Sequence, residues 1–172
     1  SALGTGPDKT NPYFETKYRA EEEIKSSGLN YVIYRPSLMF GPRDGFVNML
    51  VGILKMTPVF PIFGDGKYIF QPVSIYNVAD AVVKSIEDSG RDRRIYSACG
   101  PERMDYNHIA GAIKEQMGVK RFLIHVPFAV VKPLVKFAEI LKIPIPVSTE
   151  QLEMLRAGSI CDDDNFVRDF KL

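Results

Sequence analysis

The chain has 172 residues, of which 45% are hydrophobic and 25% are charged, so it can bury the core of one domain or slightly more. Its 22 basic and 21 acidic residues are interspersed, and the basic surface that nucleic acids require is lacking, which excludes a nucleic-acid partner. No leader-like segment opens the chain, and no apolar run reaches the roughly 18 residues of a spanning helix. We expect a cytoplasmic protein.

The two cysteines and two histidines do not form a metal-binding pattern. Cys99 and Cys161 have no spacing typical of zinc or redox motifs, and we interpret both as ordinary thiols in a reducing compartment, with a single disulfide as the alternative. His108 and His125 stand 17 residues apart without cysteine or carboxylate neighbours at ligand spacing. The sequence therefore predicts no metal site.

The first third of the chain alternates between loop, helix and strand signals. Residues 1–3 resemble the end of a strand, and the glycine-rich residues 4–9 predict a loop. Asn11 is suited to cap a helix over 13–26, with Pro12 at its first position, a Glu21–Lys25 pair along it and Gly28 after its end. A β-branched and aromatic run predicts a strand at 31–34, and helical spacing follows at 46–56.

The remaining elements continue the alternation. Strands at 59–63 and 68–73 flank the turn residues Gly64-Asp65-Gly66 and are expected to form a hairpin. Further helices are predicted at 78–89, with Asn77 as the cap, and at 105–117, 128–142 and 149–157; further strands are predicted at 94–98 and 121–126; residues 161–172 are expected to be an irregular arm with a solvated acidic run. This alternation indicates an α/β fold.

Tyr13 and Lys17 are the candidate catalytic pair. Four residues apart on a helix, their side chains share one face, about 5–6 Å apart at Cβ. A positive charge beside a phenol favours the phenolate, which can then move a proton while hydride is transferred to a cofactor. The alternative interpretation is a surface tyrosine beside a solvated lysine, because such pairs also arise by chance.

Four motifs in chain order resemble the extended branch of the short-chain dehydrogenase/reductase superfamily, the NAD-dependent epimerase/dehydratase proteins. They are Asn11-Pro12-Tyr13-Phe14-Glu15-Thr16-Lys17 with Ala20-Glu21, then Arg35-Pro36-Ser37-Leu38-Met39-Phe40-Gly41-Pro42, then Gly64-Asp65-Gly66, and then Pro72-Val73-Ser74-Ile75-Tyr76-Asn77-Val78-Ala79-Asp80-Ala81. The stretches Ser1-Ala2-Leu3-Gly4 and Asp44-Gly45-Phe46-Val47-Asn48 are similar to the atypical subgroup related to the accessory Rossmann-type subunit of respiratory complex I.

The resemblance implies roles for five residues. Tyr13 would be the catalytic acid and base, and Lys17 would hold the nicotinamide ribose while stabilising the phenolate. Pro36 and Ser37 would lie against the nicotinamide. Ser1 would match the serine that orients the substrate, or it is an ordinary terminal serine. Two partners remain open for Arg35, which are an anionic group of a ligand and a carboxylate of the protein at the edge of the core.

The family's phosphate-binding Gly-x-x-Gly-x-x-Gly turn has no counterpart here. Gly4-Thr5-Gly6 does not replace it, because Pro7 and Asp8 follow and a carboxylate repels phosphate. We therefore expect the C-terminal part of a Rossmann-like fold plus a small substrate-binding subdomain, with residues 1–45 as the remnant of the Rossmann-type domain and 46–172 as mostly the subdomain. Alone, this stretch would be inactive, bind neither NAD nor NADP, and self-associate or swap domains through an exposed sheet edge.

The resemblance leaves three functions open. The parent protein would be an NAD(P)-dependent epimerase, dehydratase or reductase acting by hydride transfer on a sugar nucleotide or another hydroxyl-bearing metabolite. It would otherwise be a non-catalytic, cofactor-bound scaffold or assembly factor of the complex I type, or a redox-sensing binding module. The apolar stripe over 128–142 is interpreted as core packing, or as a dock for an isoprenoid-like substrate, a membrane surface or a partner subunit.

Overall fold

The computed structural model describes residues 1–7, 11–143 and 147–171, and it divides the chain into two compact units. The first unit joins Ser1–Gly41, Phe70–Arg103 and the residues from Ser159 onward; the second joins Pro42–Ile69 and Met104–Gly158. Each unit is therefore built from stretches that are distant in sequence. Asp8 and Lys9, the end of the predicted loop, lie outside the described residues.

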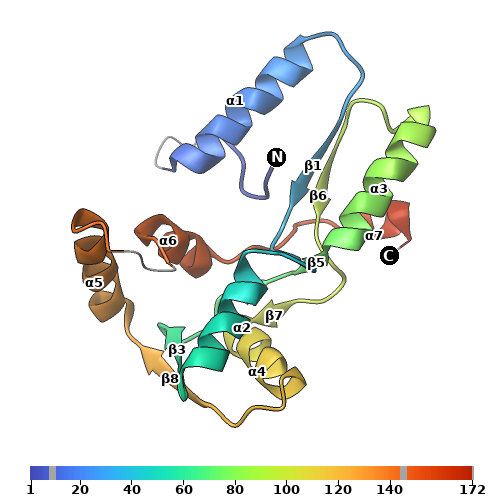
Figure 1. Cartoon of the computed structure of the whole chain (residues 1–172). Helices are drawn as coiled ribbons and strands as arrows, with labels where there is room; N and C mark the ends of the chain where they lie inside the picture. Colours follow the sequence, from blue (N-terminus) through green and yellow to red (C-terminus); the bar gives the residue numbers. More distant parts are fainter. Residues whose placement is uncertain (8–10, 144–146, 172) are drawn as a thin grey trace. The chain divides into compact units, whose positions relative to one another are not determined.

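The first unit contains two pairs of parallel strands. β1 (Val32–Pro36) pairs with β6 (Arg94–Ala98) in a register that runs from Val32 opposite Arg94 to Pro36 opposite Ala98 (Figure 1). β2 (Met39–Phe40) pairs with β5 (Val73–Ser74). The unit also holds α1 (Pro12–Ser26), α3 (Ile75–Glu87), a short 3-10 helix (Ser89–Arg91) and α7 (Asn165–Phe170). Parallel pairing with helical connections confirms the α/β prediction.

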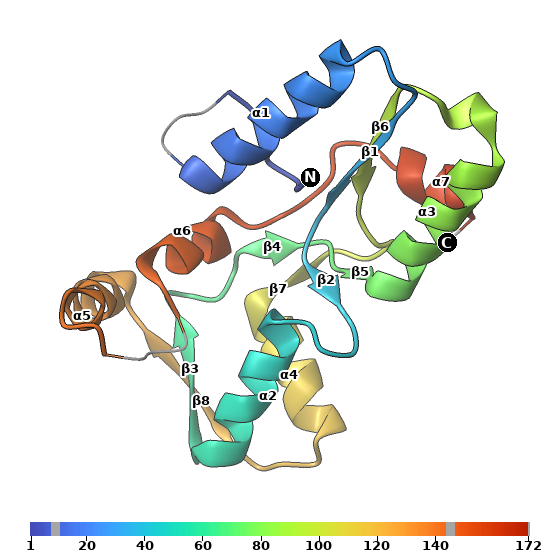
Figure 2. The same cartoon turned by 45° about the horizontal axis from the view of Figure 1, so that its top comes forward.

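The second unit pairs β3 (Val59–Phe63) with β8 (Phe122–Val126), again in parallel (Figure 2). Its helices are α2 (Phe46–Met56), α4 (Tyr106–Gln116), α5 (Phe128–Ile140) and α6 (Thr149–Ala157), and β7 (Met104–Asp105) precedes α4. β4 (Ile69–Phe70) lies where the chain leaves this unit. In the part of the chain that the structure describes, no helix is long and apolar enough to cross a membrane.

The predicted hairpin is wrong. β3 takes β8 as its parallel partner, and the strand expected at 68–73 is divided into β4 and β5. Pro72 lies between these two short strands, and its missing N–H interrupts a ladder of hydrogen bonds. The turn residues Gly64 and Gly66 do adopt positive φ angles of 67° and 68°, so the local turn chemistry was interpreted correctly and only its tertiary context was not.

The start of one helix and the N-terminal segment also differ from expectation. α3 begins at Ile75 and its cap is Ser74, whose hydroxyl oxygen accepts a hydrogen bond from the Tyr76 N–H at 3.3 Å; Asn77, the expected cap, lies inside the helix. Residues 1–3 form no strand, although the Leu3 N–H donates to the Pro36 carbonyl at the end of β1 at 2.9 Å. The N-terminal segment is thus attached to β1 by a single backbone bond of the kind expected for a neighbouring strand.

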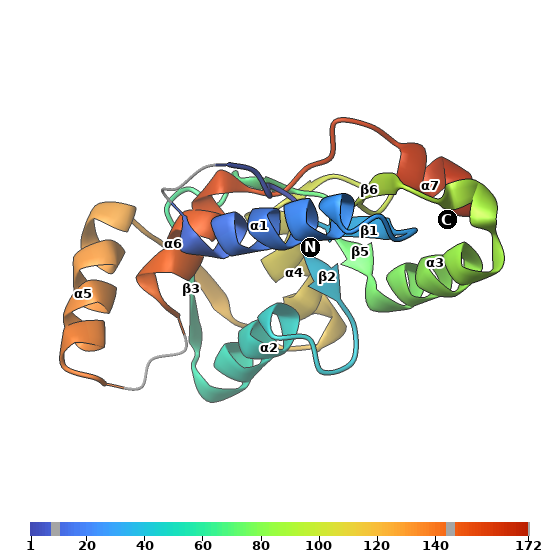
Figure 3. The same cartoon turned by 90° about the horizontal axis from the view of Figure 1, so that it is seen from above.

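The expected C-terminal arm is instead the helix α7, which packs against β6 (Figure 3). Phe166 and Phe170, four residues apart, project from one face and are each 1% exposed. They close the core of the first unit together with Tyr34 and Tyr96, whose rings stack at 5.8 Å. Burial of two aromatic side chains explains why so short a helix forms despite the acidic run before it.

Candidate active site

Tyr13 and Lys17 share one face of α1, as the sequence predicts. The Asn11 side chain accepts a hydrogen bond from the Tyr13 N–H at 3.0 Å and so fixes the start of the helix, with Pro12 in the first turn. The Lys17 ammonium lies 5.6 Å from the centre of the Tyr13 ring. Tyr13 is 40% exposed, whereas Lys17 is half-buried. The pair therefore presents a phenol that a small molecule can reach, with a cation directly beside it.

Ser1 is held by a carboxylate on the same helix. Its hydroxyl donates to Glu21 Oε1 at 2.5 Å and lies 3.1 Å from the Thr5 hydroxyl. Glu21 follows Lys17 by one helical turn, so Ser1 lies against the face that carries the candidate pair. Its role in orienting a substrate stays a prediction.

Arg35 takes a carboxylate at the edge of the core, the second of the two open alternatives. Its Nε and Nη2 atoms donate to the two oxygens of Glu21 at 2.8 and 2.5 Å, a bidentate ion pair between β1 and α1. Burial by itself would raise the pKa of Glu21. Hydrogen bonds from Arg35 and Ser1, with the charges of Arg35 and Lys25, outweigh burial and hold that pKa below its ordinary value.

The lowered pKa of Glu21 predicts a loss of stability in acid. A carboxylate whose folded pKa is depressed contributes stability above its unfolded pKa of about 4.3, and this contribution is lost as the pH falls through the folded pKa. The difference in unfolding free energy between the wild type and Glu21→Gln should therefore be largest near neutral pH and shrink below about pH 4.3. Urea titrations at several pH values measure it, and a difference that grows in acid would contradict this assignment.

Pro36 and Ser37 lie at the carboxyl end of β1, where ligands bind in open parallel sheets. The Ser37 N–H donates to the Ala98 carbonyl at the end of β6, at 3.0 Å. The buried Ser37 hydroxyl lies 3.0 Å from the carbonyl oxygen and 2.9 Å from the hydroxyl of Ser159. Ser159 is thus a neighbour of the site that sequence reasoning missed, since 122 residues separate the two serines.

The two cysteines form a disulfide, so their interpretation as free thiols is wrong. Cys99 follows β6 directly and is bonded to Cys161, with 6.1 Å between their Cα atoms. The buried Gln71 side chain spans the same place, donating to the Gly100 carbonyl at 2.7 Å and accepting from the Cys161 N–H at 3.2 Å. These bonds fix residues 159–161 beside the ends of β1 and β6.

Tyr13, Lys17, Pro36 and Ser37 are the residues that would hold the nicotinamide end of a dinucleotide, and their roles stay predictions. Gly4 has a φ of +87°, and a Cβ there would meet the Phe14 ring at 3.3 Å. This glycine therefore serves close packing of the N-terminal segment on α1, and residues 1–3 before it form no strand of the kind that precedes a phosphate loop.

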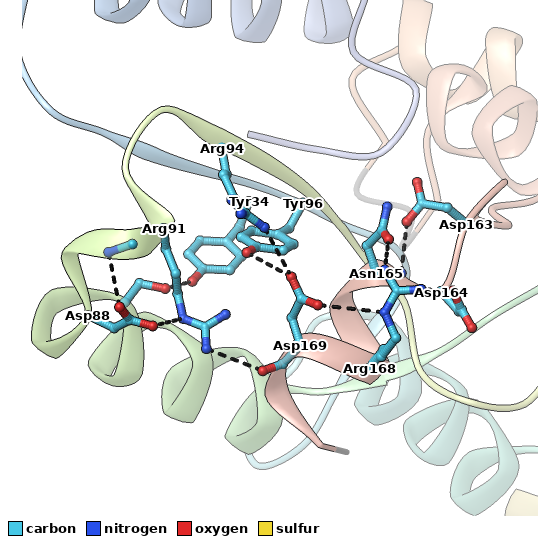
Figure 4. Close-up of polar contacts among 12 residues, drawn as sticks. Tyr34, Asp88, Arg91, Arg94, Tyr96, Asp163, Asp164, Asn165, Arg168 and Asp169 are labelled. Carbon is cyan, nitrogen blue, oxygen red and sulfur yellow. Dashed lines mark hydrogen bonds and ion pairs between the residues drawn. The ribbon is translucent and has the colours of Figure 1, made fainter.

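A second polar cluster surrounds α7 (Figure 4). Tyr96 donates to Asp169 Oδ2 at 3.1 Å, and Tyr34 bonds to the Ala81 carbonyl and to Ser85. A shallow hollow of about 260 Å³ is lined by Asp88, Gly90, Arg91, Arg94 and Asp169. Its cations are paired, Arg91 with Asp88 at 3.1 Å and Arg94 with Asp169 at 3.5 Å, so the cluster attaches α7 to the core.

Among the residues that the structure describes, no three His, Cys, Asp or Glu side chains gather as metal ligands. His125 Nε2 lies 2.9 Å from the amide oxygen of Asn107, which gives it a structural contact.

Two solved enzymes illustrate the similarity in fold. A nucleoside-diphosphate-sugar epimerase from Staphylococcus aureus aligns with a TM-score of 0.66 at 17% identity, over 96% of this chain and 57% of its own. An NADPH-dependent quinone oxidoreductase from Escherichia coli, solved with NADPH, aligns with a TM-score of 0.71 at 15% identity, over 99% and 59%. At such identities the likeness shows a shared fold.

Curated relatives include two respiratory proteins. NADH dehydrogenase [ubiquinone] 1 alpha subcomplex subunit 9, mitochondrial, of Arabidopsis thaliana is 25% identical over 98% of this chain and 43% of its own length. The NADH-ubiquinone oxidoreductase 40 kDa subunit, mitochondrial, of Neurospora crassa is 22% identical over 78% and 35%. The chain spans less than half the length of these relatives.

A family model adds the most direct assignment. The model of the NAD dependent epimerase/dehydratase family matches residues 1–99, which include α1 with Tyr13 and Lys17, and β1 with Pro36. The match covers more than half of the 172 residues. The chain therefore belongs to the NAD dependent epimerase/dehydratase family.

Proposed function

We propose that the chain is part of an NAD(P)-dependent epimerase, dehydratase or reductase that acts on a sugar nucleotide or another hydroxyl-bearing metabolite. The observation that carries this proposal is the exposed Tyr13 phenol with the Lys17 ammonium 5.6 Å from its ring centre. Family membership and the structural likeness to a nucleoside-diphosphate-sugar epimerase support it.

The proposed chemistry assigns a role to each residue. Tyr13, as the phenolate, accepts the proton of a substrate hydroxyl, so that a carbonyl can form as the carbon that bears the hydroxyl loses hydride. Lys17 stabilises the phenolate and would donate hydrogen bonds to the nicotinamide ribose. Pro36 and Ser37 would lie against the nicotinamide. When bound, NAD(P) would supply the hydride acceptor and, in an epimerase, the hydride donor of the return step.

Reduction of bound nucleotide by a sugar nucleotide tests this function. UDP-glucose is the first probe, because it was solved with a structurally similar epimerase of Thermotoga maritima, which aligns with a TM-score of 0.59 over 74% of this chain. Added to the full-length protein loaded with NAD or NADP, UDP-glucose and related sugar nucleotides should raise the absorbance of reduced nicotinamide. No change in absorbance and no epimerised or oxidised product with any sugar nucleotide or with small alcohols would reject hydride transfer.

A non-catalytic scaffold or assembly role is the second candidate, and one observation favours it. The similarity to the Arabidopsis thaliana subunit extends over 98% of the chain, including Met104–Gly158, the part of the second unit that lies beyond the family match. Under this proposal nucleotide binds and stabilises the protein, but turnover is absent and Tyr13→Phe has no effect on partner association. A redox-sensing binding module would instead change its partner affinity between oxidised and reduced nucleotide.

We also propose that this stretch self-associates. Within the described residues the β1–β6 and β3–β8 sheets have two strands each, and unpaired strand edges favour pairing with a second copy or a swapped domain. Sedimentation should therefore show dimers whose fraction rises with concentration. A monomer at every concentration would contradict the proposal.

The proposed location is the cytoplasm. The relatives named above are mitochondrial, which makes the mitochondrion the alternative for a eukaryotic source. Cell fractionation of the tagged full-length protein distinguishes the two.

A further inference from the structure

Glu21 is a buried carboxylate on α1 to which two other segments of the first unit are bonded. It is 2% exposed, although it belongs to a helix whose other residues are exposed or half-buried. It is bonded to Ser1 in the N-terminal segment and bidentately to Arg35 in β1. Lys25 lies 3.6 Å away on the same helix. Such burial of a charge is costly unless every oxygen is paired, and here both oxygens are.

The geometry connects this carboxylate with the candidate catalytic pair. Tyr13, Lys17 and Glu21 follow one another at four-residue spacing and so occupy one face of α1, with Glu21 about 12 Å along the axis from Tyr13. The guanidinium that forms the ion pair with Glu21 belongs to Arg35, which directly precedes Pro36 and Ser37. One ion pair therefore joins the helix of the proton-transferring residues to the strand end that would face the nicotinamide.

We propose that Glu21 is a positioning residue, which through Arg35 and Ser1 fixes the register of α1 against the end of β1 and so places Lys17 to hold the nicotinamide ribose. This inference rests on the proposed function. A bidentate carboxylate–guanidinium pair is suited to the task because its two parallel bonds restrict rotation as well as distance. Glu22 offers a matched contrast, since it is exposed and its carboxylate is paired with Lys25 at 2.8 Å, on the same helix.

Two probes separate positioning from general stability. NADH and NADPH contain the nicotinamide ribose that Lys17 would hold, whereas ADP lacks it. In the full-length protein, Glu21→Gln should raise the Kd of the reduced dinucleotide by about tenfold, the equivalent of one lost charge-assisted hydrogen bond. The Kd of ADP should be unchanged. Glu22→Gln should change neither. Nucleotide fluorescence and calorimetric titration give these constants without any substrate.

Two further variants keep the test decisive. Arg35→Lys retains the charge but removes the bidentate ion pair. This variant should therefore fold, even if Glu21→Gln does not, and it should weaken the binding of NADH selectively. Lys17→Ala tests the proposed function itself, and it should weaken the binding of NADH but not that of ADP. The positioning role is overturned, while the proposed function stands, if Lys17→Ala weakens NADH binding selectively and Glu21→Gln and Arg35→Lys do not. The same holds if Glu21→Gln and Arg35→Lys weaken the binding of ADP as much as that of NADH. If Lys17→Ala has no selective effect, the proposed function fails.

Discussion

Replacing Tyr13 by phenylalanine should lower the rate of nucleotide reduction by a sugar nucleotide about a thousandfold, within the range that a positioned acid or base contributes. The change removes one hydroxyl and keeps the ring that packs edge-on against Phe14 at 5.4 Å. The helix cap at Asn11 uses the backbone of Tyr13 and is not affected. Stopped-flow absorbance of reduced nicotinamide in the full-length protein measures the loss, and the Kd of NADH should stay near that of the wild type.

Tyr18→Phe is the matched control. Tyr18 lies on the same helix, one residue beyond Lys17 and therefore on a different face, and it is half-buried. It should keep the wild-type rate. A rate that survives in Tyr13→Phe would remove Tyr13 from the chemistry and favour the scaffold, whereas an equal loss in Tyr18→Phe would indicate a disturbed helix.

Loss of the Cys99–Cys161 disulfide should lower the free energy of unfolding by about 4 kcal/mol, because it releases a long loop whose ends are 62 residues apart. The bond joins the end of β6 to the segment that precedes α7, and it encloses most of the second unit. Alanine is suited to replace both cysteines, which are 2% and 1% exposed, since it leaves no buried thiol. Urea denaturation of Cys99→Ala/Cys161→Ala against the wild type measures the difference.

Reductant provides the control for this prediction. The wild type in excess dithiothreitol should approach the stability of the double variant, and dithiothreitol should have no effect on the double variant. Equal stability of the wild type with and without dithiothreitol and of the double variant would mean that the two thiols are not joined in solution.

Local sequence signals were sufficient for the elements that carry their own start and stop residues. The helix with Asn11 and Pro12 at its start, and α2 at 46–56, appear where they were predicted. Elements that depend on distant partners could not be read locally. β3 pairs with β8, about 60 residues away along the chain, and α7 forms because Phe166 and Phe170 fill a core made by β1, β6 and α3. An acidic run beside two phenylalanines has no helical signature of its own.

The residues of the candidate site also divide into those that the sequence predicted and those that it did not. Tyr13 and Lys17 were found because helical spacing alone places them on one face. Spacing also offered Glu21 as a partner of Lys25, and that ion pair is present at 3.6 Å. The bidentate pair of Glu21 with Arg35, 14 residues later, was not predicted. The contacts of Ser159 and Gln71 were beyond prediction, since contacts across 90 to 122 residues exist only in the folded chain. The disulfide was an alternative that the sequence left open. The predicted domain division into residues 1–45 and 46–172 stays a prediction. The structure divides the chain into two compact units that are each discontinuous in sequence.

Mass spectrometry of the nucleotide released on denaturing the purified full-length protein tests the proposed use of NAD(P) most directly. Both enzyme and scaffold require a dinucleotide in the family's fold, so NAD(H) or NADP(H) should be found, either as purified or after incubation with the two dinucleotides. Finding neither under both conditions would contradict the assigned roles of Lys17, Pro36 and Ser37 and leave a binding role that does not involve a nicotinamide.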